Sequence, residues 1–187
     1  GVVSCRVKRY RGDELISVLP KHPDGYVYKD IMLIVSDFAT GTLMVRRSLF
    51  DEVGGFDENL VRHQDLQLLI ELTYRKKLMQ LDEPLHCCDV SDDQNRLGPN
   101  DLVEAKRALF ESVANVYGSL RSSEKRAVAA AHRAEVGRMR VKNGETLKGA
   151  FDILGLLVAP EAFAKTIDKA LLRARGNREA RKAGDVS

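Results

Sequence analysis

Residues 40–65 read TGTLMVRRSLFDEVGGFDENLVRHQD, and they hold the clearest pattern in the chain. Within them, residues 42–45 form a compact apolar run that Gly41 opens and two arginines close. A run of this length favours a buried strand over a helix. The strand is expected to feed a short helix.

The residues that follow predict two helices joined by a glycine turn. Ser48 followed by Asp51 has the spacing of a capping box, which predicts a short helix over residues 48–53. Gly54 can adopt the positive φ that ends such a helix. After a polar turn, Asp65 opens a second helix whose apolar residues fall on one face.

The chain before this stretch predicts a strand, a hairpin and a turn. Residues 2–7 alternate in the manner of a strand, and the polar residues 11–14 resemble a hairpin or loop. Residues 23–25, Pro-Asp-Gly, are a turn signature. Residues 29–35 are mostly apolar, and a short helix is favoured there over a strand.

The chain after this stretch changes character near residue 100. Residues 78–81 and 85–88 read as two short strands around an Asp-Glu-Pro sequence, and residues 89–100 read as a polar loop. From Asp101 onward the pattern is helical.

The last part of the chain predicts a succession of helices. One of them starts at Ser122 or Ser123 and runs to about Lys142. Further helices start near Glu145 and at Pro160. This part of the chain is therefore expected to be all-α.

The order of these features resembles family 2 glycosyltransferases. Those enzymes carry a strand ending in Arg-Arg, a short helix and a Gly-Gly-Phe-Asp-Glu turn, which this chain has at residues 54–58. An acidic residue then opens the next helix, as Asp65 does. The segments at residues 23–25 and 82–85 also fall where that family has comparable segments. The resemblance covers residues 1–100.

The resemblance implies an α/β fold, namely a partial GT-A fold. In that fold a nucleotide-binding half precedes an acceptor-binding half, and this chain resembles only the second, over residues 1–100. Residues 101–187 would form the helical C-terminal region. The family's Asp-x-Asp sequence, which holds a divalent cation (Mg²⁺ or Mn²⁺) against the nucleotide diphosphate, is expected before Gly1. No metal ligands are therefore expected within the chain, and the fragment alone is expected to be inactive.

The catalytic candidate that the resemblance implies is Asp65. Sugar transfer with inversion needs a base that removes the proton of the attacking hydroxyl, and a carboxylate at a helix N-terminus is held in the ionised form that a base requires. The alternative is that Asp65 only caps its helix.

Four further residues are assigned to substrate binding. Thr40, Gly41 and Thr42 precede the strand where the family's backbone and small side chains approach donor and acceptor, although a plain strand entry is an equal alternative. Gln64 stands where the family usually has Glu, which leaves one carboxylate where many relatives have two.

The sequence departs from the family pattern at other positions as well. Leu66 replaces an aromatic residue, so contacts to the acceptor are expected to differ. Ser91 replaces a histidine that lies near the metal in relatives, and a serine is a poor ligand for a divalent cation. Asp92 and Asp93 form a loop pair without the context of the Asp-x-Asp sequence. His86 is expected to be a packing or surface residue.

The amino-acid composition limits the classes of binding partner that are expected. The net charge is +3, from 30 basic and 27 acidic residues, which argues against nucleic acid. The three cysteines have no CxxC spacing, so a reducing compartment and no zinc site are expected. No apolar run approaches the roughly 20 residues of a membrane-spanning helix. The cytoplasm is the expected location.

The tail suggests a membrane surface as a further partner. Residues 171–187 carry five basic and two acidic residues, and residues 151–158 are rich in large apolar side chains. Such a combination suits an interfacial element at the inner face of an anionic membrane. A solvated helix end, a core helix or a homodimer interface are the alternatives.

Two functions follow from the sequence. The first is a glycosyltransferase that moves a sugar from a nucleotide-sugar donor to a hydroxyl of a glycan or glycolipid acceptor. The second is a non-catalytic helical adaptor or assembly module that retains a remnant glycosyltransferase segment.

Overall fold

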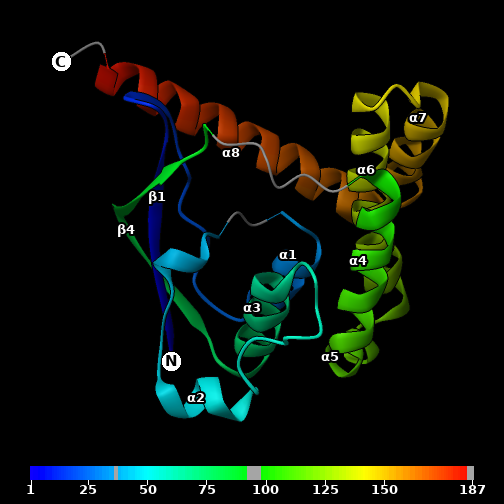
Figure 1. Ribbon diagram of the computed structural model, residues 1–187, viewed down its shortest axis with the longest axis horizontal. Helices are drawn as coiled ribbons and strands as arrows, with labels where there is room; N and C mark the ends of the chain where they lie inside the picture. The colour runs from blue at the N-terminus through cyan, green and yellow to red at the C-terminus, as the bar shows by residue number, and fades with distance from the viewer. Residues whose placement is uncertain (36–37, 92–97, 185–187) are drawn as a thin grey trace.

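The computed structural model describes residues 1–35, 38–91 and 98–184, with side chains described to Ala180. It shows a mixed α/β protein in which a four-stranded sheet stands on one side and a group of helices on the other (Figure 1). The expectation of strands followed by an all-α region is met, since every described element after residue 98 is helical.

The sheet is built around β1 (Val2–Arg11). Strand β4 (Leu78–Asp89) runs parallel along one edge of β1. The other edge is shared by β2 (Glu14–Val18), which forms the expected hairpin, and by β3 (Met44–Val45), both antiparallel to β1.

The prediction of two short strands is wrong, because strand β4 spans both segments. It is continuous, and the register with β1 shifts between Cys5 and Val7, which pair with Leu81 and His86. The residues between Leu81 and His86 therefore form a bulge. Pro84 is accommodated there because a bulge does not require its missing N–H for the ladder.

The central pattern of residues 40–65 is only partly as predicted. A 3₁₀ turn, η1 (Thr40–Thr42), precedes β3, so the strand is shorter than expected. Helix α2 (Arg47–Glu52) begins after Arg46 without a side-chain cap, so the predicted capping box is wrong. Asp51 instead accepts a hydrogen bond from Nε of Arg47 at 2.8 Å.

The two glycines after α2 have the predicted role. Gly54 and Gly55 both adopt positive φ, +83° and +69°, which L-residues rarely do. They turn the chain toward α3 (Gln64–Arg75). Together with α1 (Tyr28–Met32), α3 covers the inner face of the sheet and contributes most of the buried side chains around it.

The remaining elements form the helical side of the molecule. Their bounds are α4 (Pro99–Ser112), α5 (Ala114–Ser119), α6 (Ser122–Lys142), α7 (Thr146–Leu154), η2 (Gly155–Val158) and α8 (Pro160–Gly184). The predicted starts near Glu145 and at Pro160 are confirmed. The predicted serine cap of α6 is wrong, because the N-cap is Arg121, whose amide donates to Glu124 at 2.8 Å.

Helix α8 leaves this group of helices and returns to the sheet (Figure 1). Its Gly176 lies so close to β2 that a Cβ atom there would meet the carbonyl oxygen of Val18 at 2.1 Å. Glu179 accepts a hydrogen bond from Arg6 of β1 at 2.8 Å. The last helix thus ties the helical side of the molecule to its sheet.

One hydrophobic core joins the two sides. It runs from Val2 and Leu78 of the sheet through Leu72 of α3 to Leu109 of α4 and Ala162 of α8. Within the described residues, no helix is long and apolar enough to cross a membrane.

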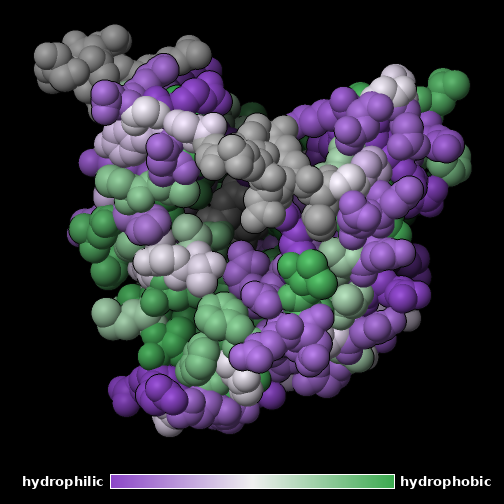
Figure 2. All heavy atoms as spheres, viewed as in Figure 1, coloured by the Kyte–Doolittle hydropathy of each residue, from purple (hydrophilic) through white to green (hydrophobic). Residues whose placement is uncertain are grey.

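The outer face of the sheet is apolar and uncovered. Because side chains alternate along a strand, Val2 and Leu78 point to the core while their neighbours Val3 and Met79 point outward. Met44 is 74% exposed on this face and Leu85 is 68% exposed. Figure 2 shows apolar residues gathered over the strands, whereas the helices opposite present mainly hydrophilic ones.

Candidate functional site

Asp65 lies in the first turn of α3, as predicted, and its side chain is exposed. The N-cap residue is His63, so Asp65 lies within the helix and is not its N-cap. One carboxylate oxygen, Oδ1, accepts the backbone N–H of Leu66 at 2.8 Å. The carboxylate is therefore oriented by the first turn of the helix.

The two residues before Asp65 hold the loop in place. His63 adopts a left-handed conformation, φ +68°, which is uncommon outside glycine. Gln64, assigned to substrate binding, donates from Nε2 to the carbonyl of Leu60 at 2.8 Å. In this structure the side chain of Gln64 thus stabilises the loop that leads into α3.

A cleft of about 390 Å³ lies beside η1 and α3. Thr40, Arg47 and Phe56 line it together with Leu68, which lies one turn after Asp65 on α3. The remaining lining residues are Leu43, Val45 and Phe50. An apolar pocket with a few polar groups at its rim is the usual form of a small-molecule site.

Phe56 is more exposed than expected for the turn. Large aromatic side chains are usually buried, but 42% of the surface of Phe56 is accessible. Gly55 has the positive φ that aims the chain back over α2, where Phe56 packs edge-on against Phe50 with ring centroids 5.9 Å apart. The two rings form one wall of the cleft.

Of the other residues assigned to substrate binding, Gly41 and Thr42 do not line the cleft. Thr42 is buried and donates from its hydroxyl to the carbonyl of Ala39 at 2.7 Å. Gly41 packs against the ring of His86, since a Cβ at position 41 would lie 2.8 Å from Cε1 of that ring. His86 is thus a packing residue that requires glycine opposite it.

Among the described residues, no group of three histidine, cysteine, aspartate or glutamate side chains is arranged to hold a metal ion. Ser91 donates to Asp89 at 2.6 Å and accepts the N–H of Gly12 at 2.9 Å, so its hydroxyl closes the end of the sheet. Asp92 and Asp93 lie outside the described residues.

A buried polar network lies behind His63, and the sequence does not predict it. Lys106 of α4 contacts Nδ1 of His132 at 3.0 Å and also pairs with Glu135, both on α6. His132 donates from Nε2 to the carbonyl of Met32 at 2.8 Å. The only signal in the sequence is that Lys106 falls on the apolar face of its helix.

Burial and charge shift the titration of this network. Burial, followed by the positive charge of Lys106, lowers the pKa of His132 to about 3. The same two causes lower the pKa of His63. Burial lowers the pKa of Lys106. Both histidines are thus neutral at pH 7.

A scan against protein-family models, a search of curated proteins and a search of solved structures each found no match for this chain.

Proposed function

We propose that this chain is the acceptor-side portion of a glycosyltransferase that uses a nucleotide-sugar donor. The observation that supports it best is the relation between Asp65 and the cleft. Asp65 presents an exposed carboxylate at the first turn of α3, and Leu68, one turn further along the same helix, lines the cleft. An acceptor that occupies the cleft would thus lie along the helix that carries the base.

The proposed reaction is a single displacement. The acceptor hydroxyl oxygen bonds to the anomeric carbon of the donor sugar, and the bond from that carbon to the nucleotide diphosphate breaks. The proton of the hydroxyl passes to Asp65, which acts as general base. The aromatic wall of the cleft would contact the apolar face of the acceptor, while Thr40 and Arg47 would bind its polar groups.

The uncovered face of the sheet supports a larger α/β domain. Apolar patches of this kind usually mark a surface that another part of a protein covers. Beyond the bridge between Gly25 and Leu78, the outer edge of β4 pairs with no strand among the described residues. A nucleotide-binding half, with the Asp-x-Asp sequence and a Mg²⁺ or Mn²⁺ ion, would pack at this side of the sheet. The chain by itself would then transfer no sugar.

Acceptor binding can be tested on this chain without the donor. Oligosaccharides of different composition are titrated into ¹⁵N-labelled protein while the amide signals are followed. We expect saturable shifts at Thr40, Phe56 and Leu68 with at least one glycan, and weaker binding in Phe56→Ala. Ser48→Ala, an exposed change on α2 outside the cleft, is the matched control. Shifts confined to other regions would contradict the acceptor site.

A second candidate function is an assembly module, which the surface of α7, η2 and α8 favours. Eight large apolar residues are exposed there, namely Leu147, Phe151, Leu154, Leu157, Val158, Phe163, Ile167 and Leu171. The test is sedimentation of the full-length protein and of the double variant Phe151→Ser/Leu157→Ser, each alone and with anionic vesicles. Homodimerisation or membrane binding lost in this variant, in a protein without transferase activity, would favour the module.

A further inference from the structure

An apolar stripe is exposed on α7 and η2, on the outer side of the helical group and away from the sheet (Figure 1). Leu147, Phe151 and Leu154 follow one another at spacings of four and three residues, which places them on one face of α7. Side chains three positions apart are eclipsed in a 3₁₀ turn, so η2 brings Leu157 onto the same face. Leu147 is 88% exposed at one end, and Val158, at the other end, is 82% exposed. These five residues are called the α7 stripe.

The opposite face of α7 fixes this helix to the rest of the molecule. Gly149 of α7 and Gly137 of α6 lie so close together that neither position has room for a Cβ atom. Asp152 is buried and accepts a hydrogen bond from Nε of Arg133 at 2.8 Å. The guanidinium of Arg133 also lies 5.1 Å from the centroid of the Phe151 ring. Rotation of the α7 stripe toward α6 would break these contacts, so the stripe stays exposed in a single copy of the chain.

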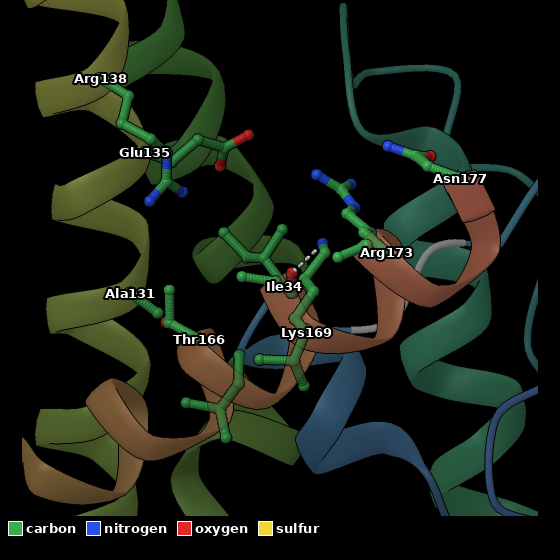
Figure 3. A pocket seen from close by; sticks show the side chains of 12 residues that line it. Ile34, Ala131, Glu135, Arg138, Thr166, Lys169, Arg173 and Asn177 are labelled. Carbon is green, nitrogen blue, oxygen red and sulfur yellow. Dashed lines mark hydrogen bonds between the residues drawn. The ribbon is translucent and has the colours of Figure 1, made fainter. Parts of the chain in front are cut away.

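The side of α6 that faces α8 has a different character. A pocket of about 630 Å³ lies between these two helices. Figure 3 shows Glu135 and Arg138 of α6 directed into this space from one side and Arg173 of α8 from the other. Lys169 donates a hydrogen bond to the carbonyl of Ile34 at 2.6 Å at the floor of the pocket. A partner that contacts mainly apolar side chains would therefore approach α6 from the side of α7.

The charges beside the α7 stripe favour a protein partner over an anionic membrane. The charged residues from position 145 to position 161 are Glu145, Asp152 and Glu161, against Lys148 alone. Lys148 is itself paired with Glu145 at 3.6 Å. A helix that binds an anionic membrane needs lysine and arginine beside its apolar face. A protein surface has no such requirement.

The α7 stripe has nearly the same spacing in both directions along the helix axis. Leu147 to Phe151 spans four α-helical steps and Phe151 to Leu154 spans three, about 6.0 and 4.5 Å at 1.5 Å per residue. Leu154 to Leu157 spans three 3₁₀ steps, about 6 Å at 2.0 Å per residue. The stripe is therefore symmetric about a point between Phe151 and Leu154. An antiparallel copy of the same helix would place Leu147 opposite Leu157, and Phe151 opposite Leu154.

The area of the α7 stripe suits a dimer interface. Burial of one side chain of this size removes on the order of 100 Å² of apolar surface from water, so the five residues present on the order of 500 Å². About 65% of a homodimer interface is apolar. The complete interface would thus cover roughly 800 Å² on each copy, which is the usual size of a stable protein–protein interface.

We propose that the α7 stripe is the contact surface for a second copy of this chain, with the two α7 helices antiparallel. The twofold axis passes between Phe151 and Leu154, so each Phe151 packs against Leu154 of the other copy. Leu147 and Leu157 meet at both ends of the interface. Closed twofold dimers are the commonest symmetric assemblies of soluble proteins. The proposal rests on the assembly module, the second candidate function, whose partner it names, and it does not depend on sugar transfer.

Sedimentation equilibrium of this chain at a series of concentrations tests the dimer. We expect the mass to rise from one copy to two as the concentration increases. Phe151→Glu and Leu154→Lys are each expected to weaken dimerisation at least about tenfold, because each change places a charge against an apolar side chain at the centre of the interface. Val61→Ser, the matched control, changes an apolar side chain that is 97% exposed in the loop before α3, and it should dimerise like the original protein. Circular dichroism checks that all variants keep their helix content.

The double variant Phe151→Glu/Leu154→Lys tests the antiparallel order of the helices. In the proposed arrangement each introduced carboxylate faces the introduced ammonium group of the other copy. The double variant is therefore expected to dimerise more tightly than either single variant. Parallel helices would bring like charges together and weaken the dimer further. A double variant that dimerises no more tightly than the single variants would overturn the proposal.

Other occupants of the α7 stripe would give different results. A dimer that neither Phe151→Glu nor Leu154→Lys weakens would use another surface, which refutes the proposal but leaves the assembly module standing. A monomer that binds anionic vesicles, and loses this binding in Phe151→Glu, would assign the stripe to a lipid surface and overturn the second copy as its partner. A protein that stays monomeric up to about 100 μM and binds no vesicles would refute both the proposal and the module.

Discussion

At the scale of single residues, the polar side chains near the cleft have two kinds of surroundings, the start of a helix or the cleft itself and the local backbone. Asp65 is found in the first turn of its helix, and Thr40 lines the cleft. The side chains of Gln64 and Thr42 instead donate hydrogen bonds to the nearby backbone carbonyls of Leu60 and Ala39, respectively. Short polar side chains often bond to the local backbone, and the sequence pattern does not reveal which of them do so.

The buried His132 predicts a dependence of stability on pH. Its pKa is about 3 in the folded protein and near 6.5 in the unfolded chain, so the unfolded chain binds the extra proton between these values. The free energy of unfolding is therefore highest above pH 6.5 as far as this group is concerned. It falls as the pH decreases toward 3, by at most about 1.4 kcal/mol per pH unit for this group. Neighbouring His63, whose pKa is also lowered, adds to the loss.

Urea denaturation at a series of pH values measures this effect. In His132→Gln the free energy of unfolding is expected to be lower at pH 7, because the contacts to Lys106 and Met32 are altered. Its decrease between pH 6.5 and 4.5 should be smaller than in the original protein. Equal decreases in both proteins would show that His132 is not the group responsible.

At the scale of elements, local signals predict where helices start and end. Pro160 and Asn143-Gly144 mark real boundaries because proline and glycine restrict or permit backbone conformation by themselves. Strand β4 was predicted as two pieces because its continuity depends on the bulge opposite Arg6. That pairing joins residues about 80 positions apart and has no local signal.

The crossing of α6 and α7 depends on two glycines. A Cβ at Gly149 would lie 2.5 Å from the carbonyl oxygen of Gly137, and one at Gly137 would meet the carbonyl of Gly149 at 2.7 Å. Gly149→Ala is therefore expected to force the helices apart and to cost about 1–3 kcal/mol. The melting temperature should fall accordingly.

Gly118 offers the matched control for this change. It lies in helix α5, where a Cβ would have no atom within 4 Å. Gly118→Ala is expected to be neutral or to stabilise the protein by up to about 1 kcal/mol, since alanine is the better helix former. If Gly149→Ala melted at the same temperature as Gly118→Ala, the close crossing would be refuted.

At the scale of the whole molecule, the sequence divides the chain near residue 100, whereas the core does not. Leu72 and Leu109 belong to one buried cluster, and His132 reaches the carbonyl of Met32 across 100 positions. Contacts between such distant helix faces depend on how the elements pack. A sequence pattern shows that a face is apolar but not which other face covers it.

This shared core predicts a single unfolding transition. Four of the five tyrosines lie before residue 100, while most helical residues lie after it. Tyrosine fluorescence therefore reports mainly on the sheet side, and circular dichroism reports mainly on the helices. The two signals should change at the same urea concentration, because both sides lose the same core. Two separate midpoints would indicate independently folding units.

The most direct test of the proposed function is sugar transfer by the full-length protein with Asp65→Asn. Nucleotide-sugars and glycan acceptors are screened first to find an active pair, and Glu58→Gln serves as a matched exposed change in the preceding loop. We expect Asp65→Asn to lower kcat by about 10²–10⁴-fold with donor binding intact, and Glu58→Gln to stay active. Unchanged turnover in Asp65→Asn would contradict the assignment of the base.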